Sequence, residues 1–199
     1  MGPRHRRILV PLALLGLAAL AITACGGGSS DEDKIVEAIE RAETTSDPGN
    51  CTELQTRRFD EQNTDEQGKA AVKACEEEEK QGKAQAKGVR ASNVAVDGEK
   101  ATAEVEFEGG PLGSQALEVA LVEEGGSWKL DQVEGFARYD GKALEEAFEK
   151  KFAEEPAGLS KKQAHCIARR IGSASQAKAE ELFFSGSSEP IIKLAEGCA

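Results

Sequence analysis

The chain has 199 residues, of which 36 are Asp or Glu and 25 are Lys or Arg, and its formal net charge is −11. Nucleic-acid phosphates must be neutralised by basic side chains, so this balance argues against a nucleic-acid partner. It also argues against a protein that lies flat on anionic lipid, and solubility is the simplest role of the excess charge. The length suffices for one medium domain, or for one small domain with an appendage.

The N-terminus has a basic start, an apolar run over residues 8–22 and the string Ile-Thr-Ala-Cys, which ends at Cys25. This order of segments is typical of a secretory signal peptide. The cysteine after small residues resembles the lipobox of the bacterial lipoprotein signal family. The resemblance implies removal of residues 1–24 and a diacylglycerol with palmitate-like acyl chains on Cys25. That lipid would anchor the protein at the extracytoplasmic face of the bacterial plasma membrane.

Two alternatives concern this leader. An uncleaved membrane helix is disfavoured, because Pro11 and Gly16 interrupt an apolar run that is shorter than the roughly 20 residues a span needs. The pair Arg6-Arg7 leaves a twin-arginine export route open, although the general secretory route is favoured. The Gly/Ser string that follows the leader predicts a flexible tether over residues 25–32.

Four further cysteines, Cys51, Cys75, Cys166 and Cys198, suggest disulfides, because an even number in an exported chain is typical of them. Their positions in the chain favour the local pairs Cys51–Cys75 and Cys166–Cys198 over the two other pairings. A zinc site is disfavoured, since there is no CxxC spacing and a single histidine remains after the leader is removed. We therefore expect neither a metal nor a cofactor.

Three helices are predicted in the first half of the chain. Apolar residues recur at helical spacing over residues 35–42, after an acidic start. A second helix carries the residues from Cys51 to Phe59, and a third has Cys75 on its apolar side. The acidic run over residues 76–79 is interpreted as a solvated helix face. A Cys51–Cys75 bridge would clamp the second and third helices together.

From residue 89 the hydrophobic period changes to two, which is typical of strands with one buried face. Asp97-Gly98 is a hairpin signal, and a glycine pair at 125–126 marks another turn. The apolar members of the four strands are Val94 and Val96; Ala101, Ala103, Val105 and Phe107; Leu117, Val119 and Leu121; and Trp128 and Leu130. We therefore predict an α+β fold, in which the N-terminal helices pack on a curved antiparallel sheet of about four strands.

Helices followed by such a sheet, with the string GGSWKLDQVEGFARYD over residues 125–140, resemble the NTF2-like (cystatin-like cone) superfamily. The likeness covers residues 33–153, particularly to its lipoprotein branch in Gram-positive, actinobacterial envelopes. It implies a cone whose helices close over the concave sheet and leave a pocket at the open end. The residues that would line this pocket are Val105, Phe107, Leu117, Val119, Leu121 and Trp128. The same side chains can instead simply fill the core beneath the helices.

Residues 158–199 form a small helical appendage after a linker around Pro156. Ser160 and Gln163 match a capping box, and short apolar stripes follow. A segment of about 40 residues rarely folds without a staple, which a Cys166–Cys198 bridge would supply. The appendage can pack on the preceding domain or on a partner, and the sequence leaves both open.

Catalysis is not expected. The resemblance includes isomerases and dehydratases that use an inward Asp or His with a Tyr donor. Here His165 lies outside the resembling region, and Tyr139, the single tyrosine, falls at a strand end where it packs or caps. The glutamates of the strands alternate with the apolar set and point away from the pocket: Glu104, Glu106, Glu108 and Glu118. The chain also lacks a G-x-S-x-G elbow and a phosphate-binding loop.

These observations predict a lipid-anchored, non-enzymatic envelope lipoprotein. Its partners would be the membrane, through the lipid on Cys25, and a small apolar or amphipathic ligand in the cone pocket. The alternative is a protein–protein interaction or assembly module of the cell envelope, which would bind an envelope protein through the sheet or the helical appendage. The acidic outer face of the sheet opposes self-association, and ligand binding is slightly favoured.

Overall fold

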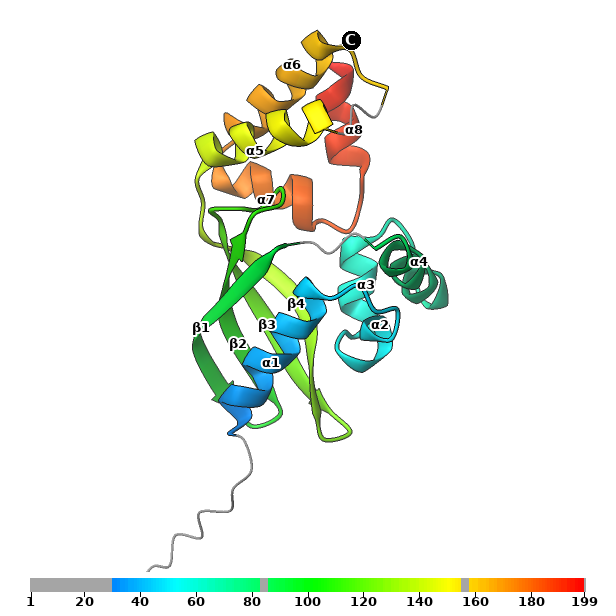
Figure 1. Ribbon diagram of the computed structural model, residues 1–199, viewed down its shortest axis with the longest axis vertical. Helices are drawn as coiled ribbons and strands as arrows, with labels where there is room; N and C mark the ends of the chain where they lie inside the picture. Colours follow the sequence, from blue (N-terminus) through cyan, green and yellow to red (C-terminus); the bar gives the residue numbers. More distant parts are fainter. Residues whose placement is uncertain (1–29, 83–85, 155–157, 199) are drawn as a thin grey trace, which may run out of the picture.

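The structure is a computed structural model, and it describes residues 30–82, 86–154 and 158–198. The expected leader, the expected lipobox with Cys25 and most of the expected tether lie outside the described residues. Within those ranges the protein has an α+β fold with a four-stranded antiparallel sheet and eight helices (Figure 1). No helix in the described part of the chain combines the length and apolarity needed to cross a bilayer.

Helix α1 (Asp31–Thr44) lies across one face of the sheet (Figure 1). It begins inside the segment 25–32 that we expected to be a tether, because Ser30 and Asp33 form a capping box that starts the helix. Its buried face is the predicted apolar stripe, which includes Ile35 and Ile39. This helix therefore closes the main core from one side.

Three short helices follow: α2 (Asn50–Glu53), α3 (Arg57–Asn63) and α4 (Lys69–Lys80). The single helix expected from Cys51 to Phe59 is wrong, because the backbone between α2 and α3 pairs with the edge of the sheet. Leu130 N donates to Leu54 O at 2.8 Å, and Thr56 N donates to Leu130 O at 2.8 Å. These bonds pair backbone groups at an otherwise exposed edge of the sheet. The pairing stabilises the fold more than the helical hydrogen bonds that are lost between α2 and α3.

The sheet is a meander with the strand order β1 (Gly88–Asp97), β2 (Lys100–Glu108), β3 (Ala116–Glu124) and β4 (Ser127–Arg138). The predicted alternation is confirmed on β2, where Ala101, Ala103, Val105 and Phe107 are buried. On β1 a bulge between Ser92 and Ala95, with Asn93 at φ +52°, changes the phase of the strand. Val94 packs against the core, but Val96, next to the hairpin turn, is 45% exposed.

The remaining helices are α5 (Gly141–Glu154), α6 (Lys161–Gly172), α7 (Gln176–Phe184) and α8 (Glu189–Glu196). They enclose a second, smaller core around Leu144, Ile167 and Ile171. Helix α5, which we expected to end the sheet domain, packs on α6 and so belongs with the C-terminal helices. Both predicted disulfides are present, Cys51–Cys75 between α2 and α4 and Cys166–Cys198 between α6 and the end of the chain.

The C-terminal helices sit at one end of the sheet, beyond the C-terminal end of α1 (Figure 1). Helix α7 packs against β4, where Gln176 Nε2 donates to Phe136 O at 2.9 Å and Phe136 N donates to Glu180 Oε1 at 3.1 Å. Phe183 and Phe184 are partly buried and pack against the main core. The appendage therefore docks on its own chain, which the sequence left open.

Candidate functional site

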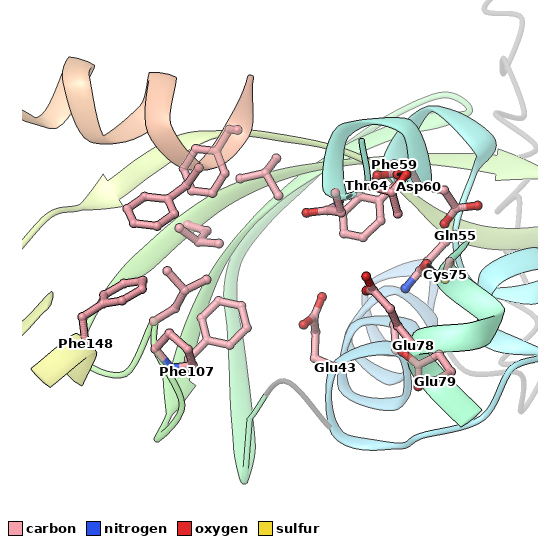
Figure 2. Close-up of a pocket in the computed structure, with 18 residues that line it drawn as sticks. Glu43, Gln55, Phe59, Asp60, Thr64, Cys75, Glu78, Glu79, Phe107 and Phe148 are labelled. Atoms are coloured by element: carbon pink, nitrogen blue, oxygen red, sulfur yellow. Dashed lines mark hydrogen bonds between the residues drawn. The ribbon is translucent and has the colours of Figure 1, made fainter. Parts of the chain in front are cut away.

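A cavity of about 280 Å³ opens where the N-terminal helices, the sheet and the C-terminal helices meet (Figure 2). Its lining comes from α1, α3, α4, β2, β3, β4, α5 and α7, together with the β2–β3 loop. The apolar lining residues are Ala42, Phe59, Phe107, Pro111, Leu112, Leu117, Val133, Phe148, Phe183 and Phe184. The polar ones are Glu43, Gln55, Asp60, Asn63, Thr64, Glu78 and Glu79, with the disulfide-bonded Cys75 beside them.

One side of the cavity, here called the apolar wall, is made by aromatic and aliphatic side chains from the sheet, α5 and α7. The rings of Phe148 and Phe183 stack with their centroids 5.6 Å apart, which joins α5 to α7. Phe107 enters from β2 and Leu117 from β3. Because α5 and α7 belong to the C-terminal helices, the wall is complete only when that segment is docked on the sheet.

The opposite side, here called the acidic wall, carries Glu43 on α1, Asp60 on α3, and Glu78 and Glu79 on α4. Figure 2 shows Glu43, Glu78 and Glu79 across the cavity from Phe107 and Phe148. None of the described residues that line the cavity is basic. The cavity is thus amphipathic, with apolar surface facing a concentration of carboxylates.

Asp60 is the most enclosed of these carboxylates. It is 1% exposed, and neither of its carboxylate oxygens has a hydrogen-bond partner among the described residues. Burial, reinforced by the nearby charges of Glu61 and Glu76, raises the pKa of Asp60 to about 7. A polar group buried without a partner is rare in native proteins and calls for an explanation.

Glu43 and Glu79 are half-buried carboxyls that border the cavity. Burial, followed by the charge of Glu79, raises the pKa of Glu43 to about 7. Burial also raises the pKa of Glu79, with Glu78 and Asp47 adding to it, and Glu79 Oε2 is buried without a hydrogen-bond partner among the described residues. Carboxyl groups of this kind can hold a cation when ionised, or exchange a proton with a bound molecule.

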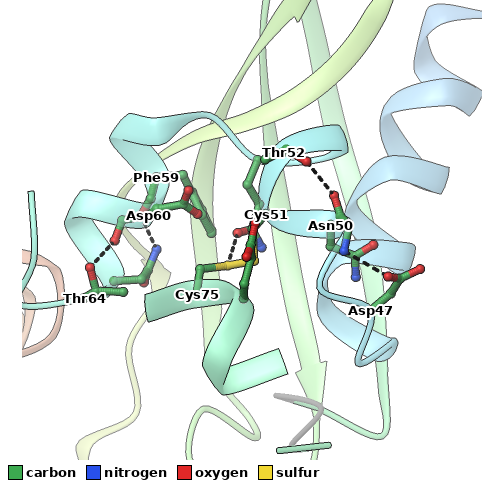
Figure 3. The surroundings of a disulfide bond; sticks show 12 residues. Asp47, Asn50, Cys51, Thr52, Phe59, Asp60, Thr64 and Cys75 are labelled. Carbon is green, nitrogen blue, oxygen red and sulfur yellow. Dashed lines mark hydrogen bonds between the residues drawn. A yellow bond between two sulfur atoms is a disulfide. The ribbon is translucent and has the colours of Figure 1, made fainter. Parts of the chain in front are cut away.

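The Cys51–Cys75 disulfide lies beside Asp60 and joins α4, which carries two of the four carboxylates, to α2 (Figure 3). It ties α4 to α2, with 6.0 Å between the two Cα atoms, and Cys75 itself borders the cavity. Thr64 Oγ1 donates to the backbone oxygen of Asp60 at 2.9 Å, which closes the end of α3 beside the bridge. The bridge therefore fixes α4, with Glu78 and Glu79, to α2, and α3, with Asp60, packs against both of these helices.

Two of the six residues predicted to line a pocket do so, Phe107 and Leu117. The other four are buried in the main core and are not among the cavity-lining residues: Val105, Val119, Leu121 and Trp128. The cavity lies at the end of the sheet near the C-terminal helices. The prediction placed the pocket at the open end of the cone, but it took as lining four residues of the concave face that pack in the core beneath α1.

Sequence reasoning missed the acidic wall, although helical spacing contains the signal. On α1, Glu43 follows the buried residues Ile35 and Ile39 at steps of four. On α4, Glu79 follows the buried residues Ala71 and Cys75 at the same steps. Residues four apart share a helix face, so each buried stripe ends in a carboxylate. In the run 76–79, which we expected to be a solvated face, Glu77 and Glu78 are exposed, whereas Glu76 and Glu79 are half-buried.

The other residues considered for chemistry lie away from the cavity lining. Tyr139 Oη donates to Ala174 O at 3.0 Å, which fixes the start of α5 to the end of α6. His165 is exposed on α6 beside Glu149. Of the strand glutamates, Glu106 pairs with Arg138 at 2.7 Å on the open face of the sheet. In the described part of the chain no group of three or more His, Cys, Asp and Glu side chains is arranged to hold a metal ion.

Comparison with protein-family models, with curated proteins and with solved structures found no match to this chain. The cavity is consequently the feature on which a function can be based. Its amphipathic lining and its unpartnered buried carboxylates are the two observations that a function must explain.

Proposed function

We propose that this protein is a lipid-anchored, extracytoplasmic, non-enzymatic binding protein that takes a small amphipathic molecule into the cavity. The observation that carries the proposal is the pairing of an apolar wall with an acidic wall around one enclosed space. Small-molecule sites are concave and mostly apolar with a few placed polar groups, and this cavity has that composition.

The size of the cavity limits the ligand. Its volume of about 280 Å³ is just below the range of about 300–1,000 Å³ that small-molecule sites occupy. A molecule with one or two rings and a short chain fits this space, whereas a membrane lipid with two acyl chains does not. The proposed ligand is therefore a small metabolite or a fragment-sized molecule of the envelope.

The proposal also takes the fold to be an NTF2-like cone and the N-terminal cysteine to be the anchor. The order of elements supports the cone, since helix α1 covers one face of an antiparallel meander and the cavity opens at an end of that sheet. The lipobox string that ends at Cys25 supports the anchor and the extracytoplasmic location. Two disulfides support an oxidising compartment.

Binding of a neutral fluorescent probe, N-phenyl-1-naphthylamine, tests the proposal. The protein would be the chain from Ser29 onward, which contains every described element, exported through an oxidising compartment. We expect saturable fluorescence enhancement with one site per chain. Leu112→Trp, which fills the cavity, should abolish the enhancement.

Leu159→Trp is the matched control, because it makes the same change at a half-buried position of the smaller core outside the cavity lining. It should bind the probe as the parent protein does. Equal binding by the parent and by both variants would place the probe elsewhere and contradict the proposal. Absence of any probe binding would instead favour the alternative, an interaction module of the envelope.

A further inference from the structure

We infer that the ligand of the cavity is an organic cation, a small apolar body that carries a protonated amine or amidine. The cationic group would lie among Glu43, Asp60 and Glu79, and the body would lie against the apolar wall. This inference rests on the proposed function, and it names the chemical class of the ligand. It is supported by the geometry of the acidic wall and by the burial of Asp60 without a hydrogen-bond partner among the described residues.

The geometry places Glu43 and Glu79, which are half-buried, at the ends of buried helix stripes. Glu43 and Glu79 each continue a buried stripe of their helix, at a step of four from Ile39 and Cys75. Surface carboxylates normally occupy the opposite, polar face of an amphipathic helix. Two helices that do not adjoin in the sequence thus aim a carboxylate into the same enclosed space.

Asp60 supplies an independent observation. Its side chain is almost completely buried, it borders the cavity, and neither oxygen has a hydrogen-bond partner among the described residues. An ionised carboxylate without a partner is costly to bury, because it loses its water and gains nothing in return. A bound cation would supply the missing partner.

Other ligand classes fit less well. An anion would meet carboxylates and no basic side chain among the described lining residues. A neutral apolar molecule would displace water from the carboxylates and leave them unpaired. A single metal ion needs several close ligands, and the described side chains form no such cluster. An ammonium group, with three N–H donors, can contact carboxylates that lie apart from one another.

The apolar wall suits the same ligand. Phe59 and Phe107 border the cavity along with the carboxylates, and aromatic rings attract a desolvated cation through the negative potential of their faces. The stacked pair of Phe148 and Phe183 provides flat apolar surface for a hydrocarbon body. A cation with an apolar body therefore uses both walls at once.

Proton release gives a further signature of this ligand. The carboxyls of Glu43 and Asp60 have pKa values of about 7, so each is partly protonated near neutral pH. A bound cation favours the ionised form, so its binding should release protons and tighten as the pH rises from about 6 to about 8. Glu79 acts on Glu43, Glu61 and Glu76 act on Asp60, and Glu78 and Asp47 act on Glu79. Glu61 and Glu76 are themselves paired with Arg57 and Lys80 at the surface.

Three probes with one hydrocarbon body test the inference by calorimetry: 4-phenylbutylamine, 4-phenylbutanol and 4-phenylbutyric acid. We expect the amine to bind about tenfold or more tightly than the alcohol, and the acid to bind most weakly. An alcohol or acid that binds as tightly as the amine would overturn the inference. If N-phenyl-1-naphthylamine binds but the amine shows no preference, the proposed function stands and the inference fails. If none of these molecules binds, both fail.

Charge-neutralising variants give the second arm. Glu43→Gln and Asp60→Asn should each weaken the amine about tenfold, while the affinity of the alcohol changes by no more than about twofold. Glu40→Gln is the matched control, because Glu40 is an exposed glutamate on the same helix. Asp60→Asn should not lower the melting temperature, so a loss of binding cannot be assigned to unfolding. Equal effects on amine and alcohol, or no effect on either, would contradict the inference.

Discussion

The side-chain amide of Gln62 pairs with both backbone groups of Val133. Gln62 Nε2 donates to Val133 O at 2.8 Å, and Val133 N donates to Gln62 Oε1 at 2.7 Å. The same Nε2 donates to Phe184 O at 3.1 Å. One amide therefore links α3, an irregular point of β4 and the end of α7, and it does so beside the cavity that Val133 and Phe184 line.

We expect Gln62→Ala to lower the free energy of unfolding by about 1–3 kcal/mol, because it leaves partly buried backbone groups without partners. Urea denaturation at constant pH measures the change. Gln67→Ala, at an exposed position, is the control and should stay within about 0.5 kcal/mol of the parent. A Gln62→Ala protein as stable as this control would show that water replaces the amide without cost.

Helices α5 and α6 are in close backbone contact at Gly141 and Gly172. A Cβ atom on Gly172 would lie 2.6 Å from Gly141 O and 2.4 Å from Glu145 Cβ, and one on Gly141 would lie 2.2 Å from Gly172 O. Because backbone atoms obstruct these positions, Gly172→Ala should cost about 1–3 kcal/mol of unfolding free energy.

Gly49→Ala provides the comparison for this substitution. Gly49 has φ −63°, and only side-chain atoms of Asp47 and Glu53 lie near its added Cβ. The thermal midpoint of Gly49→Ala should remain close to that of the parent protein, whereas the midpoint of Gly172→Ala should fall. Comparable midpoints for the two variants would mean that α5 and α6 can separate freely.

The pH dependence of stability should carry the signature of Asp60. Its pKa is raised from 3.8 to about 7 on folding, so between these values the folded state binds more protons than the unfolded state. The contribution of Asp60 to the free energy of unfolding is therefore greatest below about pH 4 and is lost as the pH rises through about 7. The total loss over this range is on the order of a few kcal/mol. The carboxyl of Glu43 changes stability in the same direction.

Asp60→Asn removes this titration. The variant should be more stable than the parent at pH 8, and the difference should shrink toward pH 5, where the parent carboxyl is protonated. Urea denaturation at both pH values measures it. An Asp60→Asn protein that is less stable than the parent at pH 8 would indicate that the carboxylate has a partner that we have not identified.

The Cys166–Cys198 bridge closes a loop with a sequence separation of 32 residues. From loop entropy, a Cys166→Ala/Cys198→Ala protein should lose about 3–4 kcal/mol of stability. The loss should also appear in the cavity, since Phe148 and Phe183 come from α5 and α7. Weaker binding of N-phenyl-1-naphthylamine, with Cys51–Cys75 intact, would confirm that the docked helices form the apolar wall. Unchanged binding would show that α7 stays docked without this bridge.

The sheet and the disulfides could be predicted because their signals are local. Alternation on β2, with a turn at Gly98, defines both the strand and its buried face. The two cysteine pairs are each close in sequence, so a compact fold brings them together. By contrast, the break between α2 and α3 depends on Leu130, which is distant in the sequence. No local pattern reports such a contact.

The candidate site was predicted only in part for a related reason. Phe107 and Leu117 belong to strands whose inward side could be read from the sequence. Which part of the inward face stays open depends on where α1 packs and where α7 docks. The acidic wall was hidden because a charged residue on a helix is usually solvated, and only the position of Glu43 relative to Ile39 shows otherwise.

The capping box at Ser30 has a consequence for how the molecule would stand on a membrane. Helix α1 starts at Asp31, so the residues between an anchor on Cys25 and this helix would span at most about 20 Å. The 14 residues of α1 then span about 21 Å, and Glu43 lies near their far end. The C-terminal helices are also at that end (Figure 1). An anchor on Cys25 and the cavity would thus lie toward opposite ends of α1, so the distance of the cavity from a bilayer would be set by the tilt of this helix.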